Sequence, residues 1–292
     1  MKKTVFYAIA ISAALLLSSC YTNSNYEEQE DEDTLQLKEE QEDEDSLQLK
    51  NIAMKKIEEG SFKLGDDTKT VSSFYMAETE TTQKLYNTIM ESNPSEHSAS
   101  PASGETQENR PVENVSFYQI LVFCNKLSVA ENLTPVYQIK NETDTSKWGN
   151  IPTDTNSDWD AVKEVSDATG FRLPHQDEWV FAALGSNAST TNGDYSNFYA
   201  GCIGTDNLGT YAWYKDNSNN TTHDVAKKTA NSNGLYDMSG NVWEILWDSH
   251  SEGHMRVGGS FEADPQNVSA NWGIPAKSGY ADTGFRVVCA AN

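Results

Sequence analysis

The stretch that most constrains the fold is residues 234–248, Gly-Leu-Tyr-Asp-Met-Ser-Gly-Asn-Val-Trp-Glu-Ile-Leu-Trp-Asp. A cluster of turn-forming residues, Ser239 to Asn241, separates two apolar segments. The second segment is too apolar for a surface loop and too short for a helix, so we predict a buried strand over 242–247. The carboxylates of Asp237 and Glu244 then lie where a turn enters the core.

Two interpretations of these carboxylates stay open. Oxygen-rich turns can hold Ca²⁺, because this hard cation takes several side-chain and carbonyl oxygens. Alternatively, Asp237 closes an Asx-type turn and Glu244 pairs with a buried arginine such as Arg286.

Six ordered motifs resemble those of the formylglycine-generating-enzyme (sulfatase-modifying factor) superfamily, whose domain is a variant of the C-type lectin fold. They are residues 59–65, 111–116, 171–174 with Glu178-Trp179, 234–244, 258–261 and 284–286. The resemblance covers about residues 52–292. It implies one irregular α+β domain with short antiparallel strands, few helices and long loops. It also implies a structural Ca²⁺ site formed by the side chains of Asp237 and Glu244 and the carbonyls of Gly240 and Val242.

The N-terminus reads as an export signal. Residues 1–19 have a basic start and a short apolar run, and Leu17-Ser18-Ser19-Cys20 resembles a bacterial lipobox. A run this short is a signal peptide rather than a membrane span. We therefore predict that Cys20 is lipidated and that its acyl chains anchor the protein to a membrane leaflet. The alternative is a cleaved signal with an incidental cysteine.

Residues 27–50 are a tandem repeat of a 12-residue unit, in which Ser46 of the second copy replaces Thr34 of the first. Each copy carries six acidic residues and one lysine. Such a composition cannot bury a core, so residues 20–51 are predicted to be a disordered acidic tether. The formal net charge of the whole chain is −23, and residues 51–292 account for −15 of it. Because phosphate binding needs clustered Lys and Arg, this charge argues against nucleic acid as a partner.

Three helices and two further strands are predicted within the domain. The helices span 79–90, 116–130 and 176–184, and the second of them begins with a capping box of Ser116 and Gln119. The strands lie near 256–261 and 284–288, and Gly258 and Gly259 permit a bulge or a close backbone approach. The long polar segments 92–110, 140–160 and 186–233 are predicted to be loops.

The best-known activity of the family is the oxidation of a cysteine in a target sulfatase. It uses copper held by two enzyme cysteines that follow the Gly-Gly-Ser-aromatic motif. Residues 262–272 of this chain contain no cysteine. Since a cuprous ion needs thiolate ligands, we expect no copper site and predict that the chain is not an enzyme.

The remaining cysteines and histidines give weaker signals. Cys124 is predicted to be a small buried hydrophobic residue. For Cys202 and Cys289, a disulfide and buried thiols both stay open. His250 and His254 have a metal-compatible spacing only on a helix, and the neighbouring serines and glycine favour a loop.

The segment 262–283 has no periodicity, yet two motifs anchor its ends. An irregular loop on a rigid scaffold is where recognition usually occurs, and Trp272 and Tyr280 are good contact residues. This layout resembles the variable proteins of diversity-generating retroelements, particularly treponemal ones, in which mutagenised codons alter this segment. The predicted contact residues are Ile245, Leu246, His250, Glu262, Ala263, Asp264, Ala270, Trp272, Ile274, Ala276, Lys277 and Tyr280. The alternative is an ordinary solvent loop with one or two buried aromatics.

The sequence thus predicts a lipid-anchored protein of the cell envelope, displayed on the outer membrane, that binds an unknown protein or glycan. The competing interpretation is an oxidoreductase like the formylglycine-generating enzymes, or another metalloenzyme, that acts on exported proteins. A third is a structural lipoprotein of the envelope.

Overall fold

The computed structural model describes residues 46–48, 52–188, 193–267, 271–275 and 277–291. Residues 41–292 form one compact unit. The predicted signal peptide, the lipidation site Cys20 and residues 20–45 and 49–51 of the predicted tether lie outside the described residues. Within the described part, no helix combines the length and the apolar composition needed to cross a membrane.

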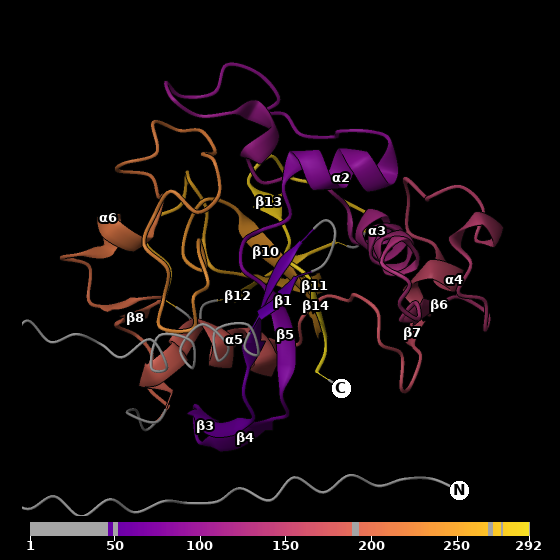
Figure 1. The fold of residues 1–292 in the computed structure, drawn as a ribbon, viewed down its shortest axis with the longest axis horizontal. Helices are drawn as coiled ribbons and strands as arrows, with labels where there is room; N and C mark the ends of the chain where they lie inside the picture. The colour runs from indigo at the N-terminus through magenta and orange to yellow at the C-terminus, as the bar shows by residue number, and fades with distance from the viewer. Residues whose placement is uncertain (1–45, 49–51, 189–192, 268–270, 276, 292) are drawn as a thin grey trace, which may run out of the picture. The chain divides into compact units, whose positions relative to one another are not determined.

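The first sheet joins the start of the compact unit to its end (Figure 1). Its strands pair antiparallel in the order β1 (Ser46–Gln48), β2 (Ala53–Ile57), β5 (Phe74–Ala77) and β14 (Val288–Ala290). A hairpin of β3 (Gly60–Leu64) and β4 (Asp67–Val71) is inserted between β2 and β5.

Strand β1 corrects the predicted limit of the tether. It lies inside the second acidic repeat, and Leu47 pairs with Met54 of β2. The prediction was wrong here because acidic composition dominates the repeat, whereas its Ser-Leu-Gln segment can hydrogen-bond to a neighbouring strand edge through the backbone alone.

The second sheet carries the 234–248 motif. Its strands lie in the order β12 (Asn271–Ile274), β11 (Gly253–Val257), β10 (Trp243–His250) and β13 (Thr283–Gly284). Strand β10 runs antiparallel to β11 and parallel to β13. It confirms the buried strand predicted over 242–247.

Helices and short strand pairs surround the two sheets. The helices are α2 (Gln83–Met90), α3 (Phe117–Ala130), α4 (Ser157–Asp160), α5 (Gln176–Leu184) and α6 (Leu208–Tyr211), with 3-10 turns η1 (Gln107–Asn109), η2 (Thr145–Lys147) and η3 (Gly185–Asn187). Two small strand pairs complete the described elements: β6 (Tyr137–Gln138) with β7 (Lys163–Glu164), and β8 (Phe198–Tyr199) with β9 (Cys202–Ile203). Short strands, few helices and long loops confirm the predicted irregular α+β class.

The predicted helices 116–130 and 176–184 are confirmed as α3 and α5, and the capping box of Ser116 and Gln119 is present. The helix predicted from residue 79 begins only at Gln83, because Thr82 has extended backbone angles and caps it through Leu85 N.

Two predicted strand limits were wrong. Strand β11 ends at Val257, since Gly258 and Gly259 take positive φ angles of 90° and 83°. Residues 284–288 do not form one strand, because the chain leaves the second sheet after Gly284 and joins the first at Val288.

Strand β10 lies between two apolar cores. One surrounds α3 and contains Ile245, and the other surrounds α5 and contains Leu246. Consecutive strand residues point to opposite faces, so the strand is covered on both sides. Strand β10 is therefore fixed by packing on both of its faces.

Candidate functional site

The motif is held by a buried ion pair between Glu244 and Arg286, with both side chains at most 1% exposed. The Arg286 Nε and Nη2 atoms lie 2.7 Å and 2.6 Å from the Glu244 Oε2 and Oε1 atoms. Trp179 Nε1 donates to Glu244 Oε2 at 2.7 Å. Arg286 also donates to the carbonyls of Ala77 and Tyr236 at 3.1 Å and 2.8 Å. The pair thus ties β10, β5 and the Gly-Leu-Tyr segment together.

Two further carboxyl groups are buried beside this pair. Glu80 accepts hydrogen bonds from Asn241 Nδ2 at 2.7 Å and Val242 N at 3.0 Å. Burial and the neighbouring carboxylates raise the pKa of Glu80 well above its usual value. Burial likewise raises the pKa of Asp237 to about 6. The three carboxyl groups of Glu80, Asp237 and Glu244 outnumber the one guanidinium of Arg286 in this cluster. The raised pKa values of Glu80 and Asp237 favour the protonated forms of both side chains.

The predicted calcium ligands fit a cation only in part. Asp237 Oδ1 is buried without a hydrogen-bond partner among the described residues, whereas Oδ2 accepts from Ala226 N at 2.8 Å. Both oxygens of Glu244 already contact Arg286, so Glu244 offers none to Ca²⁺ in this arrangement. No group of three or more His, Cys, Asp and Glu side chains in the described part has metal-binding geometry. The arginine pairing proposed for Glu244 is present, and calcium stays a prediction.

The structure corrects three of the predicted contact residues. Ile245 and Leu246 are 0% exposed and Ile274 is 1% exposed. They were expected on a binding face, but both faces of β10 are covered and Ile274 packs in the core around α3. Their role is to support the surface from below.

Three other predicted contact residues are described little or not at all. Ala270 and Ala276 lie outside the described residues. Trp272 is placed only by its backbone, which pairs with Arg256 across β12 and β11.

The remaining predicted contact residues lie at the surface. Glu262, Asp264, Lys277 and Tyr280 are exposed, and His250 and Ala263 are half-buried. Asp264 Oδ1 lies 2.5 Å from Lys215 Nζ, and Lys277 Nζ lies 3.0 Å from Asp154 Oδ1. Exposed pairs of this kind add little to stability.

Tyr280 is an exposed aromatic side chain on a fixed backbone. The residue is 42% exposed, while its carbonyl accepts from Asn114 N at 2.9 Å. The Arg256 guanidinium carbon lies 5.5 Å from the Tyr280 ring and 5.0 Å from the Trp243 ring. Arg256 in turn donates to Asp282 Oδ1 at 3.1 Å. Sequence reasoning missed Arg256, because its role depends on two rings that are distant along the chain.

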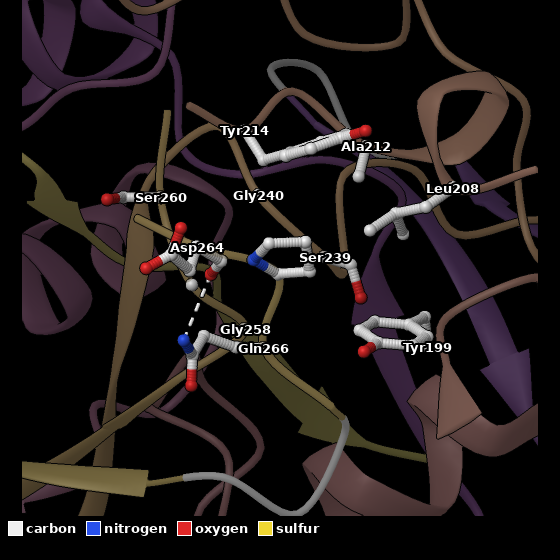
Figure 2. Close-up of a pocket in the computed structure, with 12 residues that line it drawn as sticks. Tyr199, Leu208, Ala212, Tyr214, Ser239, Gly240, Gly258, Ser260, Asp264 and Gln266 are labelled. Atoms are coloured by element: carbon white, nitrogen blue, oxygen red, sulfur yellow. Dashed lines mark hydrogen bonds between the residues drawn. The ribbon is translucent and has the colours of Figure 1, made fainter. Parts of the chain in front are cut away.

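A small pocket adjoins the Gly-Gly-Ser motif (Figure 2). In the view of Figure 2, Tyr214 lies above the pocket and Ser239 and Tyr199 lie to its right, while Gln266 Nε2 donates to the carbonyl of Asp264 at 2.9 Å on the left. Its volume of about 10 Å³ is enough for about one water molecule. The pocket as arranged does not admit a small-molecule ligand.

The cysteines and histidines have structural surroundings. Cys124 and Cys289 are buried and Cys202 is half-buried, and none of the three forms a disulfide. Cys124 is thus the buried hydrophobic residue that was predicted. The His254 ring stacks on Phe117 with ring centroids 3.4 Å apart.

These features define the class to which the chain belongs. A family model for the sulfatase-modifying factor enzyme 1-like domain (FGE-sulfatase) matches residues 39–291, and the chain belongs to this family. The predicted resemblance and the C-type lectin-like fold are therefore confirmed.

Three relatives illustrate the range of the family. Treponema denticola variable protein 1 is similar with a TM-score of 0.76 and 34% identity, over 84% of this chain and 98% of that chain. The chaperone protein LppX of Paenibacillus barcinonensis is 32% identical over an alignment of 282 positions, which covers 86% of this chain and 82% of LppX. The crystal structure of CarF is similar with a TM-score of 0.66 and 25% identity, over 84% of this chain and 100% of CarF.

Proposed function

We propose that the protein is a lipid-anchored binding protein of the cell envelope, displayed on the outer membrane. Its C-terminal segment, residues 262–280, would contact a protein or glycan ligand. The observation that carries this proposal is Tyr280, a residue that is 42% exposed while its carbonyl and the neighbouring Arg256 are held by hydrogen bonds. Rigid aromatic residues supply contact area at low entropic cost and often dominate binding energies.

The anchoring of the segment supports the same proposal. Ser260 Oγ lies 3.5 Å from Asp282 Oδ2, so the residues before and after the segment are joined. Exposed residues between two fixed ends can change at little cost in stability. The relation to a treponemal protein named a variable protein supports a segment whose residues differ between copies.

The absence of catalysis is part of the proposal. Residues 262–272 contain no cysteine that could hold copper. This observation supports binding without the copper-dependent turnover of the family.

The localisation rests on Cys20 and the lipobox that precedes it. Replacement of Cys20 by serine should release the protein from the membrane fraction, and protease treatment of intact cells should degrade the wild type. Retention of Cys20→Ser in the membrane fraction would contradict the lipid anchor.

Binding is tested with the detergent-extracted full chain on arrays of glycans and secreted proteins. Tyr280→Ala should weaken binding of any captured ligand by about tenfold or more, as expected for an aromatic anchor. The matched control is Val129→Ala, since Val129 is 63% exposed on α3, outside the proposed segment. Equal binding by wild type and Tyr280→Ala would contradict the proposed surface. Conversion of a cysteine-containing peptide by the purified chain would favour the enzyme alternative.

A further inference from the structure

A second feature, independent of the proposed binding surface, is the buried guanidinium of Arg110. The side chain is 1% exposed, although it directly follows a loop of mostly exposed residues and the η1 turn. Its Nη1 atom donates to the carbonyl of Ala99 at 3.5 Å, which is the long limit of a hydrogen bond. Nε and Nη2 are buried without any hydrogen-bond partner among the described residues.

A buried arginine destabilises the fold unless another group accepts hydrogen bonds from its N–H groups. A buried charge without a partner destabilises a fold by several kcal/mol, and each unmet donor adds to that cost. The side chains that the structure describes form no ion pair with Arg110, since the neighbouring Glu113 instead lies 3.6 Å from His97 Nδ1. A missing partner should therefore be negatively charged.

The two open atoms also have a specific geometry. The Nε–H and one N–H of Nη2 point in parallel from the same side of a guanidinium. This fork matches two oxygens of a carboxylate, phosphate or sulfate, and Arg is favoured at sites of this kind. Because the side chain is almost fully covered, the group it takes must be small enough to be enclosed.

The same stretch of chain contains other open polar atoms. In the segment 97–113, His97 Nδ1, Gln107 Oε1 and Glu113 Oε2 lack hydrogen-bond partners in the described part of the chain. These side chains are linked, because Gln107 Nε2 donates to the carbonyl of His97 at 2.5 Å and His97 N donates to Glu113 Oε1 at 2.8 Å. Unpaired buried polar groups are rare in native proteins, so their concentration in one segment indicates an enclosed polar site. Gln107 Oε1 and Glu113 Oε2 are acceptors, so of these three atoms His97 Nδ1 is the one that can donate to an anion beside Arg110.

We propose that Arg110 binds one small oxyanion through Nε and Nη2 beneath the 97–107 loop. The class of ligand is a free phosphate, sulfate or small carboxylate. The segment 97–113 borders the start of the C-terminal segment, because the rings of His97 and Phe261 form a T-shaped pair with centroids 4.8 Å apart. Occupancy would hold the loop against this framework.

The test measures binding to the full chain directly. Equilibrium dialysis with labelled phosphate, sulfate and acetate should give about one bound anion per chain for at least one of them. The same anion should raise the melting temperature above that in chloride at equal ionic strength. Failure of all three anions to bind the wild type stoichiometrically would overturn the proposal, because ordered water would then fill the fork.

Variants of Arg110 distinguish binding by its Nε and Nη2 donors from unspecific ion binding at the surface. Arg110→Lys keeps the charge and loses the fork, and Arg110→Gln loses both. Each should weaken anion binding by about tenfold or more, since hydrogen bonds to charged groups are strong. The matched control is Arg172→Gln, because Arg172 already pairs with Glu178 at 2.6 Å and should not contribute to anion binding. Binding that persists in Arg110→Lys, or several weak anions per chain, would mean surface ion binding and would overturn the proposal.

Discussion

The contact between Glu244 and Arg286 allows a quantitative test of the framework. Glu244→Gln keeps the shape of the side chain and an oxygen for Trp179, but it removes the charge that balances a guanidinium with 0% exposure. Loss of one partner of a buried pair typically costs about 3–5 kcal/mol. The negative charge of Glu244 contributes to the raised pKa of Glu80, so its loss makes Glu80 easier to ionise and offsets part of the cost. We therefore expect a loss near the lower end, about 3 kcal/mol.

Urea unfolding followed by tryptophan fluorescence measures this loss, and the slope of the free energy with urea should not change. The matched control is Asp158→Asn, which breaks the exposed pair between Asp158 and Lys140. It should cost less than about 1 kcal/mol. A double variant, Glu244→Met with Arg286→Met, should be less destabilised than the two single changes added together. If Glu244→Gln loses no more stability than Asp158→Asn, the pair does not organise the fold as inferred.

Four further predictions follow from the same geometry. Since the pKa of Asp237 is raised to about 6 above an unfolded value of about 3.9, the folded chain binds the extra proton. Its contribution to stability is therefore present below about pH 4 and falls as pH rises to about 6, by up to roughly 3 kcal/mol; urea titrations should show a smaller fall for Asp237→Asn. If Asp237 binds calcium, a chelator should lower the melting temperature of the wild type but not that of Asp237→Asn. If the melting temperature of the wild type does not change, Asp237 is a hydrogen-bonding residue only. Deletion of residues 39–50 puts Thr34-Leu35-Gln36 in the sequence position of β1, so the midpoint of urea unfolding should stay the same, whereas deletion of 27–50 should lower it. Ile274→Ala should lower the free energy of unfolding by about 2–5 kcal/mol, while Asp264→Ala should change it by no more than about 0.5 kcal/mol. Equal losses would contradict the assignment of Ile274 to the core and of Asp264 to the surface.

The elements predicted best were those with local signals. Helix α3 follows from its capping box and apolar spacing, and β10 follows from an apolar run bounded by a turn. The pairing of Glu244 with Arg286 could be named as an alternative because few other residues can neutralise a carboxylate in an apolar strand. In each case the information lies in a short stretch of sequence.

The features that were missed depend on contacts between distant segments. Whether Ile245 faces solvent is decided by α3, and whether Leu246 does is decided by α5, so the sequence of β10 alone could not tell that both are buried. Strand β1 was missed because it pairs with β2 through the backbone. Backbone pairing produces no recognisable pattern of residues in an acidic repeat. Arg110 carries no local signal either, since its open donors become evident only when the surrounding loop is in place.

The position of the anchors explains how one framework can present different surfaces. The segment 262–280 leaves the core at Phe261, which is 1% exposed, and returns at Thr283, which is buried in the second sheet. Between these points Ile274 is the described side chain that packs in the core, while the backbone of β12 is held by hydrogen bonds to β11. Glu262, Asp264 and Lys277 are exposed and lie outside β12, so substitutions at these positions leave the pairing of β12 with β11 in place. A change in ligand would then require new side chains at these positions and no change in the buried Arg286 pair.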